Sequence, residues 1–361
     1  TGERDAEYQV TKSRVDDLQI AVGCETYIEN GLVWDYTTKK CKKPACIMGA
    51  GLPKLISFDY KRLEKRLKKE QIDYVMMKTD GFHFAQQGIA DLYLSLFQRF
   101  DHTEQKRKQA VGILGAHCFS SFQKEEMEDC ATNIKKVGYE TVWPEKESLS
   151  EIEGLKNTVC NWVVASEGIP VARYLSHKYN IPYMIGIPAG KKLSSDWQTY
   201  LTEGKWNISS QAQSRQAKKK KVLLIGDPAV TWGIAKYLME TETAELVFAV
   251  YTQLVSSRRW YTETLRGTEE HWLGGHNPVK EIQYFKDRTE LKVLIEEADV
   301  IFGDSLLKMA FTEEELCEKK WTDLPTPFLN CGIRTDKYEY HLSGTKGARW
   351  IHAGAAKKAC N

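Results

Sequence analysis

The sequence lacks any long apolar run of the kind that a membrane helix needs. None of its 361 residues belongs to a hydrophobic stretch of the roughly 20 residues that span a bilayer, and the N-terminus has no apolar signal-peptide core. Charge of one sign is also lacking, with 51 Lys and Arg against 49 Asp and Glu. No strong field therefore favours nucleic acid or an anionic membrane surface. These absences predict a cytoplasmic globular protein with no nucleic-acid partner and no membrane partner.

Several common chemical signatures are missing as well. The nine cysteines are scattered and odd in number. No two C-x2-C knuckles occur, so the sequence predicts reduced thiols rather than a disulfide framework or a structural zinc site. Cys41 and Cys46 form only a C-x4-C. No G-x-G-x-x-G and no G-x-x-x-x-G-K-[ST] is present, which predicts no nicotinamide fingerprint and no ATP site on this chain.

Apolar strand-like segments alternate with amphipathic helical segments along most of the chain. Ala110 to Gly115 is a continuous apolar run, typical of a strand covered on both faces, and a helix is predicted over Lys124 to Val137. Helices are likewise predicted over Asp59 to Glu70 and over Ile169 to Tyr179. Asn157 to Ala165 is apolar enough for a central strand, and Asp17 to Gly23 is interpreted as the approach to a strand. Alternation at this spacing predicts parallel, doubly wound sheets.

The predicted fold class is therefore α/β, with three doubly wound Rossmann-like domains. A chain of 361 residues is long enough for two or three domains. The predicted boundaries are 1–105, 106–215 and 216–361, and the third domain ends in a closing helix over Gly344 to Ala359.

One stretch combines a cysteine with a glycine-rich bend. Cys46 lies at the end of a predicted short strand, and Gly49 and Gly51 follow it. These glycines allow a sharp turn and a close approach of the backbone to a bulky ligand. A soft thiolate in such a place suits iron or an iron–sulfur cluster, while the alternative is a buried cysteine that packs as a small hydrophobe.

Polar residues follow several predicted strands. The pattern is a glycine with a polar neighbour, at Asp80–Gly81, Gly115–His117, Gly226–Asp227 and Gly303–Asp304. The carboxyl ends of parallel strands face the crevice where ligands bind, although glycine and aspartate also punctuate strand ends with no ligand. His83 and His117 are candidates for substrate contact or proton relay, with a capping role as the alternative. Candidate cofactor contacts are Gly49, Gly51, Asp80, Gly81 and Gly115.

In their order and spacing, these segments resemble the component-1 subunits of the nitrogenase family over nearly the whole chain. Cys46 to Asp59 is similar to the family's Cys-Pro-x-x-Ile-Gly-Asp-Asp segment, and Asn161 to Pro182 to its Asn-Leu-Val…Tyr-Gly-Ile-Pro stretch. Further similar segments are Asp17–Gly23, Thr79–Gly88, Lys221–Leu238, Asp287–Asp304 and Gly344–Asn361. The superfamily also includes dark-operative protochlorophyllide reductase, cluster-assembly scaffolds and the reductive cyclase of nickel-tetrapyrrole synthesis.

The resemblance implies a nitrogenase-like oxidoreductase subunit. Such a subunit receives electrons from an ATP-hydrolysing iron–sulfur reductase through an interface iron–sulfur cluster, expected to be [4Fe-4S], with Cys46 as a ligand. It also implies a homologous or identical component-1 subunit as partner. The alternatives are a scaffold of the same family that holds a metal cluster or tetrapyrrole, and a ligand-binding protein of stacked Rossmann-like domains without metal.

The sequence also departs from the family pattern. In the catalytic nitrogenase subunit, a cysteine and a histidine hold the metal cofactor, and here those places fall near Val164 or Ala165 and at Gly332. A molybdenum–iron cofactor held as in nitrogenase is therefore not expected. The family's N-terminal portion, with its first cluster cysteines, has no counterpart, which predicts a truncated chain or a divergent branch. Cys24 and Cys41 fall outside the family's ligand positions.

Overall fold

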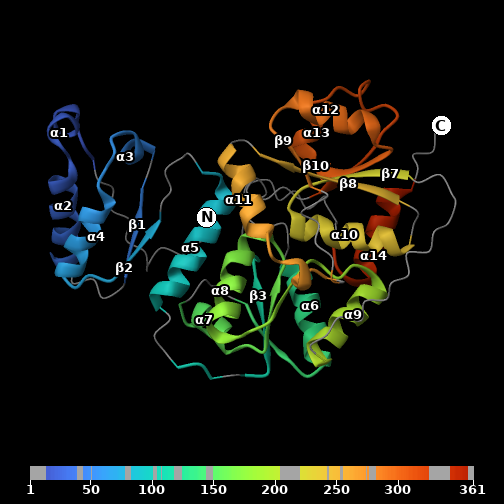
Figure 1. The fold of residues 1–361 in the computed structure, drawn as a ribbon, viewed down its shortest axis with the longest axis horizontal. Coiled ribbons are helices and arrows are strands. Elements are labelled where there is room, and N and C mark those ends of the chain that lie inside the picture. The colour runs from blue at the N-terminus through green and yellow to red at the C-terminus, as the bar shows by residue number, and fades with distance from the viewer. Residues whose placement is uncertain are drawn as a thin grey trace. The chain divides into compact units, whose positions relative to one another are not determined.

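The computed structural model describes most of the chain, and its described residues form two compact units. The described residues are 14–38, 44–49, 51–77, 83–100, 104–106, 108–117, 124–143, 149–203, 220–241, 244–252, 255–273, 275, 282–324 and 342–356. Unit 1 covers residues 1–82 and unit 2 covers residues 83–361 (Figure 1). Among the helices that the structure describes, none combines the length and apolar composition needed to cross a bilayer.

Unit 1 is a small α/β unit around a two-stranded parallel sheet. Its elements in chain order are α1 (Asp17–Val22), α2 (Glu25–Thr38), β1 (Ala45–Met48), α3 (Gly51–Leu55), α4 (Tyr60–Lys69) and β2 (Tyr74–Met77). The amphipathic pattern of α4 is confirmed, since Leu63 and Leu67 are its buried residues and Asp59 accepts a first-turn backbone N–H at its N-cap. The unit's core consists of Cys24, Phe58, Leu63, Leu67 and Ile72.

The strand predicted over Asp17 to Gly23 is wrong, because this segment forms helix α1. Asp16 and Gln19 make reciprocal side-chain bonds to each other's backbone N–H, which is a capping box. Gly23 ends the helix with a φ of 93°. Leu18 and Val22 are exposed on this short helix, so these apolar residues do not indicate a buried strand.

The first sheet of unit 2 has four parallel strands in the order β4-β3-β5-β6. Its elements are α5 (Ala85–Phe100), β3 (Ala110–Leu114), α6 (Lys124–Lys136), β4 (Glu140–Val142), α7 (Leu149–Gly154), η1 (Leu155–Asn157), β5 (Cys160–Val163), η2 (Ser166–Gly168), α8 (Ile169–Tyr179), β6 (Tyr183–Ile185) and α9 (Gly190–Glu203). Every residue of β3 and β5 is buried, as the continuous apolar runs predicted.

The second sheet of unit 2 has five parallel strands in the order β11-β10-β7-β8-β9. Its elements are β7 (Lys220–Ile225), α10 (Pro228–Thr241), β8 (Ala244–Tyr251), α11 (Val255–Leu265), η3 (Glu269–His271), β9 (Ile282–Phe285), α12 (Arg288–Glu297), β10 (Val300–Asp304), α13 (Ser305–Lys308), β11 (Lys320–Leu324) and α14 (Gly344–Ala355). The closing helix is confirmed as α14, while residues 357–361 lie outside the described residues.

The two sheets of unit 2 share one continuous hydrophobic core. Helix α10 lies against β7 and β8 on the side that faces the first sheet (Figure 1). The backbone N–H of Leu273 donates to the carbonyl of Ile185 at 2.9 Å, so the chain leaving α11 pairs with the end of β6. Trp232, fully buried on α10, donates its indole N–H to the carbonyl of Leu273 at 3.0 Å. This shared core fixes how the carboxyl ends of the central strands face each other.

The observed sheets are all parallel and have helices between successive strands, which confirms the predicted fold class. The predicted boundaries at 105/106 and 215/216 stay a prediction. Four of the observed elements, α9, α11, β9 and β11, were not predicted from the sequence.

Candidate functional site

Cys46 is an exposed thiol in unit 1, placed by the parallel pairing of β1 and β2 opposite Val75. Its Sγ lies 3.6 Å from Sδ of Met77. Although the residue is exposed as a whole, partial burial of its sulfur raises the pKa of the Cys46 thiol. The thiol is thus accessible to a metal, but a metal has to displace its proton.

The two glycines after Cys46 have different roles. A Cβ at Gly49 would collide with the hydroxyl of Tyr60, so close approach of that ring explains the glycine. The N–H of Gly49 donates to the carbonyl of Met77 at 3.3 Å, which continues the pairing of β1 and β2. Gly51 begins α3. The role of both glycines as cofactor contacts stays a prediction.

The described residues supply only part of a cluster site. A [4Fe-4S] cluster takes about four cysteine ligands, and the described residues contain no group of three or more metal-ligating side chains. Cys24 is 1% exposed and packs in the core of unit 1. Cys41, Asp80 and Gly81 lie outside the described residues. Cys46 therefore fits a cluster as a single ligand, and the other ligands must come from beyond these residues.

His83 and His117 belong to unit 2 and differ in surroundings. His83 is exposed and precedes α5, where the next residue, Phe84, packs edge-on against Trp260 with ring centroids 5.2 Å apart. His117 follows β3, and its side chain is only 2% exposed. Its Nε2 lies 2.9 Å from Oε1 of Glu167. The structure therefore places His117, but not His83, within a buried polar cluster.

This buried polar cluster consists of His117, Ser166, Glu167, Asp227 and Tyr261. It forms where β3, β5 and β7 end, since His117 follows β3, Ser166 and Glu167 follow β5, and Asp227 follows β7. The Glu167 side chain is 2% exposed, and its Oε2 has no hydrogen-bond partner among the described residues. Two strands of one sheet and one strand of the other thus bring their terminal polar residues together.

Asp227 is the centre of the cluster's hydrogen bonds. Its carboxylate accepts the backbone N–H of Ser166 at 3.0 Å and that of Ala229 at 2.8 Å, and it contacts Oγ of Ser166. Burial, followed by the charge of Glu167, raises the pKa of Asp227 to about 7 against these stabilising hydrogen bonds. Tyr261 on α11 hydrogen-bonds Ser166, and its own burial raises its pKa well above the ordinary value.

Gly115, a predicted cofactor contact, has a packing role in this structure. Its φ is +87°, and a Cβ here would lie 2.8 Å from the carbonyl oxygen and 2.9 Å from the nitrogen of Ala165. Only glycine allows the ends of β3 and β5 to approach this closely. Whether Gly115 also contacts a cofactor stays a prediction.

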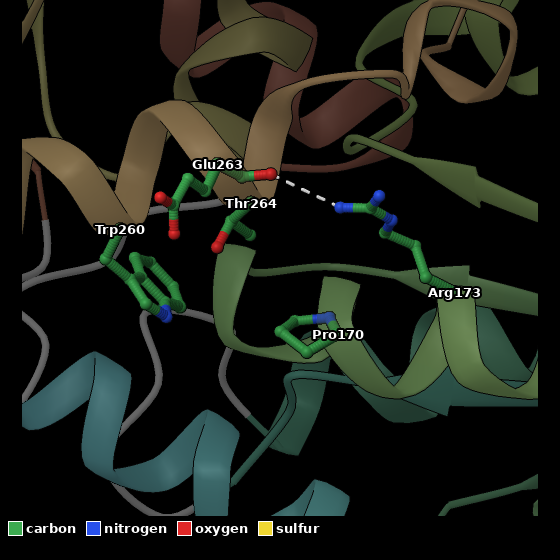
Figure 2. Close-up of a pocket in the computed structure, with 5 residues that line it drawn as sticks. All are labelled: Pro170, Arg173, Trp260, Glu263 and Thr264. Atoms are coloured by element: carbon green, nitrogen blue, oxygen red, sulfur yellow. Dashed lines mark hydrogen bonds between the residues drawn. The ribbon is translucent and has the colours of Figure 1, made fainter.

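An open pocket of about 290 Å³ lies between α8 and α11, which also carry or adjoin members of the buried polar cluster. Figure 2 shows the Trp260 indole on α11 at one side, and the Pro170 ring and the Arg173 guanidinium, both from α8, at the other. Arg173 donates to the backbone carbonyl of Glu263 at 3.2 Å (Figure 2). Thr264 completes the lining. The pocket offers an aromatic face beside a cation.

Sequence reasoning identified two members of the buried polar cluster and missed three. The strand-end pattern marked Gly226–Asp227 and Gly115–His117. Ser166, Glu167 and Tyr261 were missed, because Tyr261 belongs to a helix and the polar pair Ser166–Glu167 before Gly168 was not counted among the strand-end sites. The acid in Ser166–Glu167–Gly168, directly after a predicted apolar strand, was the available signal.

Comparisons with known proteins place the chain in a family. The search of curated proteins found no match. A solved structure described as nitrogenase Cp1 at pH 6.5 is similar to 94% of this chain and 80% of its own, with a TM-score of 0.60 and 12% identity. One described as nitrogenase Cp1 at pH 5 is similar over 94% of this chain and 75% of its own, with a TM-score of 0.54 and 12% identity. At this identity, the likeness shows the fold.

The family model for nitrogenase component 1 type oxidoreductases matches residues 6–318. This match confirms the resemblance inferred from the motifs around Cys46 and from Asn161 to Pro182. Because the match extends over most of the chain, the protein belongs to the nitrogenase component 1 type oxidoreductase family.

Proposed function

We propose that this chain is the subunit of a nitrogenase-like reductase that receives electrons from an ATP-hydrolysing iron–sulfur reductase. The family match over residues 6–318 carries the proposal. In this proposal an iron–sulfur cluster, held in part by Cys46, supplies one-electron transfer when bound. In this proposal the chain itself contributes the ligand, the strand β1 that carries it and the surrounding packing.

The environment of Cys46 supports a ligand role. Its residue is exposed, whereas Cys24, Cys130 and Cys160 are buried. Soft thiolate is the ligand that iron–sulfur clusters use. Because the thiol must lose its proton on binding and its pKa is raised, cluster loading should improve as the pH rises.

The ligand count among the described residues favours a second polypeptide. The described part of unit 1 has one exposed thiol and no cluster of three metal-ligating groups, so these residues alone offer too few ligands for a [4Fe-4S] cluster. We propose that an identical or homologous component-1 subunit supplies the rest across the face that carries Cys46. The chain has no phosphate-cradling motif, so ATP hydrolysis belongs to the separate reductase.

Anaerobic reconstitution with iron and sulfide tests this proposal. The full chain, Cys46→Ala and the matched control Cys317→Ser, which alters another exposed thiol, are each analysed for bound iron and native mass. We expect iron in an assembled fraction of the parent and of Cys317→Ser, and its loss in Cys46→Ala with an unchanged circular dichroism spectrum. Equal iron in Cys46→Ala, or a monomer with a complete cluster, would overturn the assignment.

A second measurement tests electron flow. The loaded protein is mixed with an ATP-hydrolysing iron–sulfur reductase, and cluster reduction is followed by its absorption. We expect reduction only with both ATP and the reductase present. Hydrolysis of ATP by the purified chain alone would contradict the proposal.

A further inference from the structure

We propose that Glu167 and Asp227 together bind one proton at neutral pH, and that this proton stabilises the junction between the two sheets of unit 2. The inference goes beyond the proposed function and does not rest on it. The two carboxyl groups come from different sheets, since Glu167 follows β5 and Asp227 follows β7. The hydrogen bonds from Ser166 to Asp227 therefore cross the junction directly.

Both acids are withdrawn from water without a strong cation beside them. Glu167 is 2% and Asp227 is 7% exposed. Among the residues that the structure describes, neither carboxyl group pairs with a lysine or arginine. A buried charge is costly unless it is paired, and two neighbouring carboxylates raise each other's proton affinity. The junction therefore favours one neutral acid over two carboxylates.

The described titratable groups that face the pair are His117 and Tyr261. His117, after β3, has its Nε2 2.9 Å from Oε1 of Glu167. Tyr261 on α11 is influenced by both acids and by Tyr284 on β9, and its raised pKa keeps it neutral. Within the described part of the chain, the imidazole contacts Glu167 and the Tyr261 phenol is neutral, so no cation lies against the Asp227 carboxyl group.

The geometry indicates where the proton lies. Asp227 Oδ2 contacts Oγ of Ser166, so a neutral Asp227 can donate its O–H to that hydroxyl. The Ser166 hydroxyl can then donate to Tyr261, its other partner. The backbone N–H groups of Ser166 and Ala229 favour the ionised form, whereas burial and Glu167 favour the neutral one. The balance gives a group that titrates near neutral pH.

Loss of the proton weakens the junction. When the closed junction holds one more proton than an opened, hydrated one, the ratio of closed to open forms falls about tenfold per pH unit. The pH range in which this ratio falls lies between the ordinary pKa of an aspartate and the raised pKa of Asp227. Above the raised value, both states have lost the proton and the ratio becomes constant.

Infrared spectroscopy of the full chain tests the protonation state. Parent, Asp227→Asn, Glu167→Gln and the control Asp129→Asn, which removes an exposed carboxyl on α6, are titrated from pH 5 to pH 9. We expect the C=O stretch of a neutral carboxylic acid in the parent and in Asp129→Asn at pH 6, and its disappearance by pH 9. Asp227→Asn should lack this band at pH 6. In Glu167→Gln the titration midpoint should move to lower pH, because the neighbouring charge is gone.

Hydrogen exchange at the Ser166 amide tests the junction. Its protection factor, corrected for intrinsic exchange, should fall about tenfold per pH unit between pH 5 and pH 7 in the parent and stay flat in Asp227→Asn. If Asp227→Asn does not fold, the parent titration and the Glu167→Gln midpoint decide the question. A parent without a neutral-acid band at pH 6, a midpoint unmoved in Glu167→Gln, or pH-independent protection of Ser166 in the parent would each overturn the proposal.

Discussion

Replacement of Gly115 by alanine should strongly destabilise unit 2. Gly115 has a φ of +87°, a region in which an alanine costs about 1–2 kcal/mol. The added methyl group would also lie 2.8 Å from the carbonyl oxygen of Ala165, a backbone atom that cannot rotate away. Overpacking in a closely packed interior costs about 1–3 kcal/mol. The two effects together predict a loss of about 2–5 kcal/mol in the free energy of unfolding.

Two other glycines separate these contributions. Gly267 also has a positive φ, +71°, but no atom lies within 4 Å of its hypothetical Cβ. Gly267→Ala should therefore lose only the backbone contribution, about 1–2 kcal/mol. Gly88 lies in α5 with open space around it, so Gly88→Ala should stabilise the protein by about 0.5–1 kcal/mol through helix propensity.

Urea unfolding followed by far-ultraviolet circular dichroism measures the three variants. We expect midpoints in the order Gly88→Ala, parent, Gly267→Ala, Gly115→Ala, from most to least stable. Equal midpoints for Gly115→Ala and Gly267→Ala would mean that β3 and β5 separate at no cost, which refutes the packing argument. If folded Gly115→Ala binds less iron than the parent in reconstitution, Gly115 also has the cofactor role that the sequence predicted.

Three further predictions follow from single contacts. Asp59→Ala removes the N-cap of α4 and should cost about 1 kcal/mol in unit 1, measured by hydrogen exchange of the helix, whereas Asp59→Asn should retain most of it. Trp162→Phe leaves the carbonyl of Gly186 without its 2.7 Å indole donor and should cost about 1–3 kcal/mol in urea, and an unchanged midpoint would contradict this role. The N–H of Thr312, with nearby cations, lowers the pKa of Glu315 to about 2; its stabilisation is present above the ordinary glutamate pKa and lost as pH falls towards 2, so Glu315→Gln should flatten the acid limb of the stability profile.

Local patterns were sufficient to predict most elements that pack by a single face. The helix predicted over Ile169 to Tyr179 agrees with α8 at both ends. A proline at its start and an asparagine just after its end are the sequence signals, and this asparagine has a φ of 52° in the structure. The prediction for Asp17 to Gly23 was wrong because the apolar residues of this segment are exposed. The spacing of exposed residues carries no information about a buried face. Its capping box was the signal that should have prevailed.

The buried polar cluster could be predicted only in part, since its chemistry depends on contacts between two sheets. Asp227 carries a local signature, a polar residue after a buried strand that ends in glycine. Its partner Ser166 is 61 residues away in sequence, and their contact exists only because the shared core fixes the two sheets relative to each other.

Glu167 has a similar signature, since it precedes Gly168 after the buried strand β5, but a glutamate in a turn is ordinarily exposed. Its burial against His117 contradicts that expectation. Burial disfavours the charged form of an ionisable residue, so such a residue is retained at a cost to stability. Residues of this kind gather at functional sites. For that reason the junction of Glu167 and Asp227, rather than the better predicted helices and strands, is where mutagenesis of unit 2 should begin.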